Sequence, residues 1–274
     1  MFAGGSISKD FAPHAVKAGA VVIDNSSAFR MDPEVPLVVP EVNPQAILKH
    51  KGIIANPNCS TIIMVMALKP IYDLAKIKRV IVSTYQAVSG AGKEGIDELD
   101  AQVRDHSEGR EMTANILPSA SAEKHYPIAF NLIPQIDVFC DNLYTKEEMK
   151  MVNETKKIME DYEMRITATT IRVPVYRSHS ESVNIELEKE VDLGAMREAL
   201  AKFPGVTVQD DPSKQEYPMP LYTSEKDDVY VGRLRRDESC EKSYNMWVVG
   251  DQIRKGAALN TLQIAETMIK NGWI

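Results

Sequence analysis

The chain has 274 residues, a formal net charge of −7 and 44% hydrophobic residues. The acidic balance argues against general electrostatic binding of nucleic acid, and no apolar run reaches the length of a membrane span. The three cysteines, Cys59, Cys140 and Cys240, show no metal-binding spacing and fit a reducing compartment. We therefore expect a cytoplasmic globular protein of one large or two ordinary domains, without a metal site.

The first sixty residues alternate short apolar runs with turns. The pattern predicts a helix over 11–18, and it reads 1–6 as the end of a strand that leads into a glycine turn. Runs of Val and Ile near 21–25, 37–40 and 52–55 are typical of strands buried on both faces of a parallel α/β sheet. Because chains seldom begin at the tip of a core strand, we expect an earlier part of the fold to precede Met1.

Cys59 stands in the sequence Asn-Pro-Asn-Cys-Ser-Thr, directly before a long apolar run. Asn and Pro favour a turn, and Ser and Thr suit the start of a helix. A thiol in the first turn meets unpaired N–H groups and the positive end of the helix dipole, which favour a thiolate. On this local motif alone, a nucleophile and a buried structural cysteine remain equally open.

A helix is predicted over 62–76, with Pro70 as a kink or break, followed by a strong strand over 79–85. Gln86 comes directly after that strand, where its amide can orient a carbonyl or stabilise an oxyanion, although a loop glutamine bonded to backbone is the simpler interpretation. The segment 89–92 carries Ser89 and Gly90; it can bring backbone close to a ligand or serve only as a turn.

Residues 105–144 are rich in loops, and the four residues from Thr145 to Glu148 predict a capping box for a helix that ends near 162. Glu147 and Lys150 lie three residues apart on one face of that helix. A lysine in the first turn opposes the usual preference for acidic side chains there, which an anion bound beside it would explain. A solvated surface pair is the alternative.

Arg172 stands within a predicted strand over 165–176, and His179 lies in a serine-rich turn that suits a general base. A buried arginine needs an anionic partner, from the protein or from a ligand. The separation of seven residues puts the two side chains on opposite faces of a straight strand, so they share a site only if the chain bends. Further elements are predicted as a strand at 182–188, a helix at 192–203, strands at 206–209 and 229–236, and a long helix at 252–271.

These motifs together resemble the bacterial aspartate-semialdehyde dehydrogenases over essentially the whole chain. The matching segments are 24–30, 39–43, 56–61, 83–92, 172–175 with His179, and 250–258. The resemblance implies an α/β fold like that of glyceraldehyde-3-phosphate dehydrogenase, with a truncated Rossmann-type parallel sheet and a catalytic domain with a mixed sheet. It implies residues 1–58 and 247–274 for binding NADP, and residues 59–246 for catalysis and dimerisation.

The resemblance also implies a role for each matching residue. Cys59 would attack the aldehyde of aspartate semialdehyde, His179 would take the thiol proton, and Gln86 would place the reacting carbonyl. Substrate and phosphate would be bound by Arg172 at the carboxylate, Glu147 at the amine, and Arg30, Asn58 and Lys150 at the phosphate. The nicotinamide would lie near Ser89, Gly90, Gln252 and Asn260.

In the biosynthetic direction the implied reaction reduces aspartyl 4-phosphate with NADPH and feeds lysine, methionine and threonine synthesis. The family's N-terminal strand, glycine-rich turn and helix, which hold the cofactor pyrophosphate, have no match here. A catalytically silent fragment or a partner-dependent piece of such an enzyme is therefore an alternative. N-acetyl-γ-glutamyl-phosphate reductase is a weaker one, because its cysteine motif differs. The family implies a homodimer or a dimer of dimers.

Overall fold

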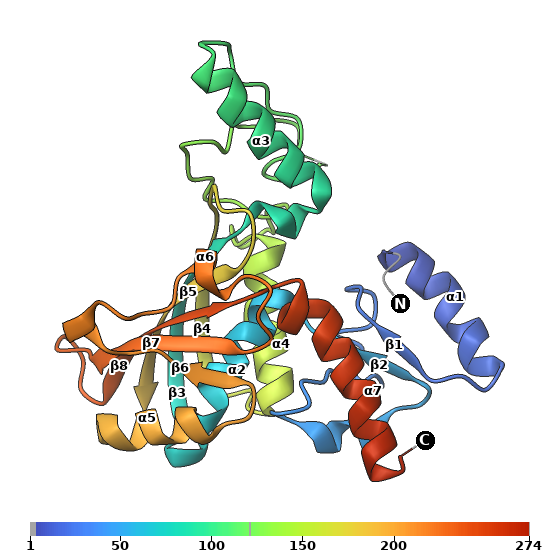
Figure 1. Cartoon of the computed structure of the whole chain (residues 1–274). Coiled ribbons are helices and arrows are strands. Elements are labelled where there is room, and N and C mark those ends of the chain that lie inside the picture. Colours follow the sequence, from blue (N-terminus) through green and yellow to red (C-terminus); the bar gives the residue numbers. More distant parts are fainter. Residues whose placement is uncertain (1–3, 121, 274) are drawn as a thin grey trace.

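The computed structural model describes residues 4–120 and 122–273 as a large mixed sheet and a small parallel sheet, each with its own helices (Figure 1). The strands are β1 (Val22–Asp24), β2 (Ile53–Ala55), β3 (Ile77–Gln86), β4 (Arg165–Arg172), β5 (His179–Leu187), β6 (Val206–Val208), β7 (Val229–Arg236) and β8 (Ser243–Gly250). The α-helices are α1 (Gly5–Lys17), α2 (Cys59–Leu74), α3 (Lys93–Ser107), α4 (Lys146–Met159), α5 (Leu193–Lys202), α6 (Pro220–Thr223) and α7 (Leu259–Asn271).

The large sheet has six strands in the order β4-β3-β5-β8-β7-β6. The pairs β3–β4 and β6–β7 are parallel, and the other pairs are antiparallel. Helices α2, α4 and α5 cover one face, where the alternate apolar residues of the strands join the main hydrophobic core. Helix α2 is buried along almost its whole length, because it lies between the sheet and the other two helices.

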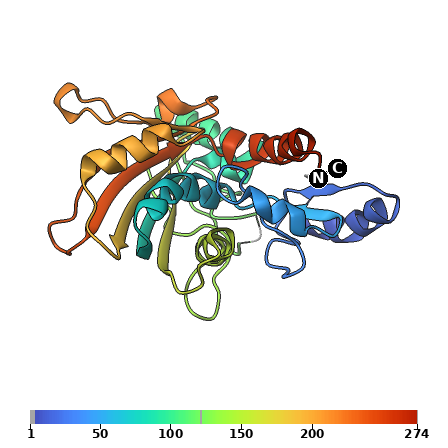
Figure 2. The ribbon, with the colours of Figure 1, turned by 90° about the horizontal axis from the view of Figure 1, so that it is seen from below.

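The small sheet pairs β1 with β2 in parallel, and the chain at Leu37 extends it by a single bridge to Ala55. Helices α1 and α7 lie beside it, at the end of the molecule away from the large sheet (Figure 2). A separate apolar cluster, which includes Ile54 and Ile264, holds α7 on this sheet. Ala55 and Leu37 of the small sheet also belong to the main core, so the two sheets share a core as well as having this separate cluster. A small parallel sheet beside a larger mixed sheet is the α/β fold that the sequence predicts.

Several predicted elements have different bounds in the structure. Helix α1 begins at Gly5, ahead of the predicted 11–18, and Ser8 near its start donates a hydrogen bond of 2.6 Å to Asp24 at the end of β1. The predicted glycine turn at 4–6 is therefore the start of this helix, and the predicted strand end at 1–3 lies outside the described residues. Helix α2 continues through Pro70, because burial on all sides stabilises it despite the lost N–H donor.

The C-terminal half also differs from the prediction. Strand β4 ends at Arg172, so the chain leaves the sheet before 176; β8 at 243–250 was not predicted at all. This strand crosses the predicted domain boundary at 246/247, and the large sheet extends to Gly250. The predicted helix 252–271 begins as a π-helical turn, Arg254–Ala258, and becomes regular only at α7.

Helix α3 projects from the end of the large sheet together with the loops that follow it (Figure 1). A small third core that includes Leu99 and Leu117 supports this projection. The part of the chain that the structure describes contains no helix long and apolar enough to cross a membrane.

The predicted capping box is confirmed at the start of α4. The Thr145 hydroxyl accepts from the Glu148 N–H at 3.2 Å, and the Glu148 carboxylate accepts from the Thr145 N–H at 2.7 Å. We expect Thr145→Ala to lower the free energy of unfolding by about 1–2 kcal/mol, measured by urea denaturation. Asp192→Ala, at the exposed N-cap of α5, is the matched comparison and should cost less. An equal or smaller loss for Thr145→Ala would contradict this account.

Candidate active site

Cys59 is the first residue of α2, as the sequence predicts. Asn58 is the N-cap, and its side-chain oxygen accepts from the Thr61 N–H at 3.1 Å. The thiol lines a cavity of about 400 Å³ together with Arg30, Ser89, Gly90 and Gln252. The π-helical turn packs directly against Cys59, since a Cβ on Gly256 would lie 3.0 Å from the Cys59 Cβ. A side chain there would have to push against Cys59, so glycine suits this close approach.

The pKa of the Cys59 thiol differs from the sequence prediction. Burial, and next the negative charge of Glu147, raise this pKa to about 12. Arg30, Arg172 and the Ser60 N–H lower it, so the predicted effect of the helix start is present but smaller than the cost of desolvation. In this state the thiol is protonated at neutral pH.

Glu147 is the centre of a buried hydrogen-bonded cluster. One carboxylate oxygen accepts from the Asn58 amide at 2.9 Å and from the Gln86 amide at 3.2 Å. The other oxygen accepts from Lys150 at 3.1 Å, and Lys150 also bonds to Asp137 at 3.0 Å. Although burial opposes ionisation, Lys150 and these donors hold the pKa of Glu147 below its usual value. The pair is therefore part of the site and not the solvated surface pair of the alternative interpretation.

Arg172 and His179 lie on either side of the end of β3. Register pairs Gln86 with Arg172 on β4, and β5 begins on the other side of β3 at His179. The intervening chain leaves the sheet and turns at Ser178, which has a positive φ of 69°. Arg172 and His179 therefore do not lie on one straight strand, and the bend that the sequence analysis requires for a shared site is present.

Gly90 connects these two side chains to the cavity. A Cβ on Gly90 would lie 2.6 Å from the Arg172 Nη1 and 3.3 Å from the His179 ring. Arg172 is buried, and within the described residues it donates only to the Ala87 carbonyl, at 2.7 Å, leaving its Nε without a partner. A buried guanidinium with free donors beside a cavity is suited to bind an anionic ligand.

His179 is fully buried, and its Nδ1 accepts from the Ala87 N–H at 3.1 Å. Because a neutral imidazole carries one proton, this bond puts the proton on Nε2; the Gln86 amide nitrogen 3.4 Å away is also a donor, so that contact is not a hydrogen bond in this tautomer. Burial, and next the charge of Arg172, lower the pKa of His179 well below its usual value. The ring is therefore neutral and presents an N–H donor.

Arg30 reaches the cavity from the loop after β1 and is held by a residue that the sequence analysis did not identify. Its Nη1 bonds to Glu154 at 3.2 Å, and its Nη2 donates to the Asn25 carbonyl at 2.9 Å. Glu154 also accepts from the backbone N–H of Asn58 at 2.6 Å. The sequence does contain a sign of this role: Glu154 lies seven residues after Glu147 and therefore on the same face of α4.

The four residues expected near a nicotinamide do not all lie together. Ser89 and Gln252 form a hydrogen bond to each other, and with Gly90 they line the cavity beside Cys59. Asn260 is buried away from the cavity lining: it donates to the Asn56 side chain at 2.7 Å and accepts from Lys255 at 3.0 Å. Asn260 therefore ties α7 to the segment before α2 and does not face the cavity.

Comparisons with known proteins agree with this architecture. A family model described as the semialdehyde dehydrogenase dimerisation domain matches residues 68–255, and one described as the semialdehyde dehydrogenase NAD binding domain matches residues 1–50. The fold and the cysteine site thus define a semialdehyde dehydrogenase with a fold like that of glyceraldehyde-3-phosphate dehydrogenase.

Similar proteins narrow the class. Aspartate-semialdehyde dehydrogenase of Aquifex aeolicus is 57% identical over 99% of this chain and 79% of its own length, and that of Bacillus subtilis is 54% identical over 98% and 78%. The crystal structure of aspartate semialdehyde dehydrogenase II from Vibrio cholerae has a TM-score of 0.92 at 48% identity, covering 98% of this chain and 78% of that one. The chain belongs to the aspartate-semialdehyde dehydrogenase family.

The raised pKa of Cys59 predicts how its alkylation depends on pH. In a Cys140→Ser, Cys240→Ser background without ligands, the rate with iodoacetamide should rise about tenfold per pH unit from pH 7 to 9, because the thiolate fraction rises in that proportion below the pKa. A plateau in this rate between pH 6 and 8 would instead show that the helix start lowers the pKa of Cys59 more than burial raises it.

Proposed function

We propose that this chain catalyses the NADPH-dependent reductive dephosphorylation of L-aspartyl 4-phosphate to L-aspartate 4-semialdehyde, and the reverse phosphorylating oxidation, in the synthesis of lysine, methionine and threonine. Family membership supports this reaction over that of N-acetyl-γ-glutamyl-phosphate reductase. The single observation that carries the proposal is the thiol of Cys59 beside a buried, incompletely paired Arg172 in one site.

The charges of the cluster suit both ends of an amino acid. The Arg172 guanidinium would bind the substrate α-carboxylate through its free donors. The ionised Glu147 would bind the substrate ammonium group, in exchange for part of its present contact with Asn58, Gln86 and Lys150. These two anchors would place the carbon chain between them and direct its far end towards Cys59.

The chemistry would begin when the Cys59 Sγ attacks the carbonyl carbon of the aldehyde: the S–C bond would form, the C=O π bond would open, and the thiol proton would end on the oxygen of the resulting thiohemiacetal. The Nε2–H of His179, in the tautomer described above, suits donation to the developing oxyanion. This tautomer supports an acid role for His179 better than the predicted role of taking the thiol proton. Arg30 and Asn58, which line the cavity, would then hold the phosphate that releases the acyl group from Cys59, with Lys150 joined to Asn58 through Glu147.

The cavity wall fits an NADP nicotinamide beside Cys59. Gly90, Gly256 and Ala257 keep this wall free of large side chains, while Ser89 and Gln252 offer polar atoms. When bound, NADP would supply the hydride acceptor of the oxidative direction. We retain the proposal that the small sheet with the C-terminal segment serves this cofactor and that the large-sheet domain serves catalysis.

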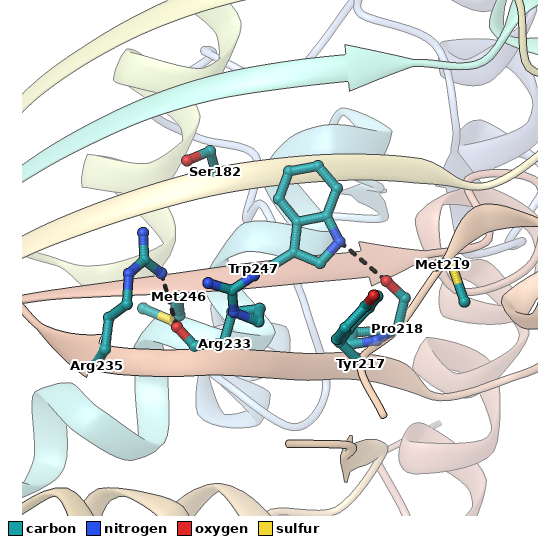
Figure 3. Close-up of a pocket in the computed structure, with 8 residues that line it drawn as sticks. All are labelled: Ser182, Tyr217, Pro218, Met219, Arg233, Arg235, Met246 and Trp247. Carbon is teal, nitrogen blue, oxygen red and sulfur yellow. Dashed lines mark hydrogen bonds between the residues drawn. The ribbon is translucent and has the colours of Figure 1, made fainter. Parts of the chain in front are cut away.

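We also infer that two copies pair through the face of the large sheet that α2, α4 and α5 leave uncovered. A cavity of about 310 Å³ on this face is lined by residues that include Trp247 and Arg235 (Figure 3). Ser182 is exposed there, in register with Trp247 on β8. The matched dimerisation model, which spans the whole large sheet, supports pairing through this domain. The three free thiols support a cytoplasmic location.

Replacement of the nucleophile tests the reaction. Cys59→Ser should lower the turnover number by roughly 10³-fold or more, because a serine hydroxyl without an activating base is a weak nucleophile. Cys140→Ser and Cys240→Ser should retain activity, measured as NADPH formation from aspartate semialdehyde and phosphate. If the unmodified chain shows neither turnover nor saturable NADPH binding, the proposed function fails in favour of the silent-fragment alternative.

A charged side chain on the uncovered face tests the dimer. Ser182→Arg should shift the chain from dimer to monomer in sedimentation velocity, because two such residues would meet near the centre of the buried face. Leu48→Arg, at an exposed apolar residue on the small-sheet side, is the matched control and should leave the dimer intact. A dimer that withstands Ser182→Arg would place the interface elsewhere.

A further inference from the structure

Helix α4 presents a stripe of charged side chains towards the active site. Glu147, Lys150, Glu154 and Lys157 are spaced by three, four and three residues, so they lie on one face of the helix. Glu147 and Lys150 belong to the cluster around Asn58 and Gln86. Lys157 donates to the carbonyl oxygens of Arg30, Asp32 and Val35 at 2.7–2.8 Å and thereby fixes the loop that carries Arg30.

Glu154 is the member of this stripe whose role the reaction does not explain. It is 1% exposed, and its two oxygens take different partners: Oε1 accepts from Arg30 at 3.2 Å and Oε2 from the Asn58 N–H at 2.6 Å. One partner lines the cavity and the other precedes the nucleophile. The carboxylate therefore fixes Arg30 relative to the start of α2.

We propose that Glu154 is a positioning residue that aims the Arg30 guanidinium at the phosphate subsite in front of Cys59. The inference rests on the proposed function for the identity of the anion. Glu154 occupies Nη1 and the Asn25 carbonyl occupies Nη2, so the arginine cannot rotate away from the cavity. The Nε, which is buried and unpaired in the structure, remains as a donor, as do the second hydrogens of the terminal nitrogens.

A carboxylate is required at this position because both of its partners are donors. In Glu154→Gln one end of the side chain would be an N–H₂ group, which would face either the guanidinium or the Asn58 N–H. Either arrangement leaves a buried donor without an acceptor. Arg30 would then lose its orientation while its loop stayed anchored by Lys157.

The decisive measurement is protection of Cys59 from iodoacetamide by inorganic phosphate, in the Cys140→Ser, Cys240→Ser background. This readout reports phosphate binding without requiring turnover. We expect Glu154→Gln to raise the apparent Kd of phosphate about tenfold or more, with Glu154→Asp intermediate because it keeps the charge. In steady-state assays the KM for phosphate should rise more than the KM for the aldehyde. Glu160→Gln, at the exposed end of α4, is the matched control and should change neither.

The outcomes separate this inference from the proposed function. If phosphate protects the unmodified chain but that chain has no turnover, the reaction fails and the role of Glu154 is still tested. If folded Glu154→Gln keeps the phosphate Kd within twofold, or if both KM values rise equally, the positioning role is wrong. Should Glu154→Gln not fold, Arg30→Met and Arg30→Met with Glu154→Leu are compared instead. Equal phosphate protection in these two supports the inference, and a further loss in the double variant overturns it.

Discussion

The site depends on how Asn58 is fixed ahead of Cys59. Its side chain caps α2 through Thr61 and donates to Glu147, and its backbone N–H donates to Glu154. Three bonds in different directions leave this residue one position, so the first turn of α2 has one orientation relative to α4. Because Cys59 is the next residue, the position of its thiol is set by contacts with a helix almost ninety residues later in the chain.

Burial, and next the charge of Glu147, keep the Cys59 thiol protonated in the free protein. Two buried carboxylates, Glu147 and Glu154, stand on one helix face, and Glu147 raises the pKa of the thiol. Arg30 and Arg172 oppose that effect, and each keeps a buried Nε without a hydrogen-bond partner in the described residues. A substrate ammonium group that neutralised Glu147 would lower the pKa of Cys59, because it would offset a negative charge that favours the protonated thiol. In the proposed reaction, the same carboxylate would therefore link substrate binding to activation of the thiol.

Local chemistry in the sequence was enough to predict some of this arrangement. The turn before Cys59, the strand that delivers Gln86 and the capping box at Thr145 each depend on neighbouring residues, and each has the predicted place. Strand β8 was missed although Tyr244, Met246 and Val248 alternate as a strand with one buried face should. This alternation was present in the sequence, but it was a weaker pattern than that of the helix that follows it. Pro70 was misjudged for the opposite reason, since packing around α2 overrides a local preference.

The rest of the site could not be predicted from spacing because it is made by long-range contacts. Nothing near Arg172 in the sequence reveals that β3 lies between it and His179. This strand order nevertheless brings both residues to the end of β3, beside Gln86. Asn260, two residues after the matching segment 250–258, also makes long-range contacts: its hydrogen bonds hold α7 to the chain before α2. A polar residue can thus act on a site indirectly, by holding the segment of chain that carries the site residues. Glu154 acts in the same way on Asn58, and its participation follows from two partners that lie 124 and 96 residues away in the chain.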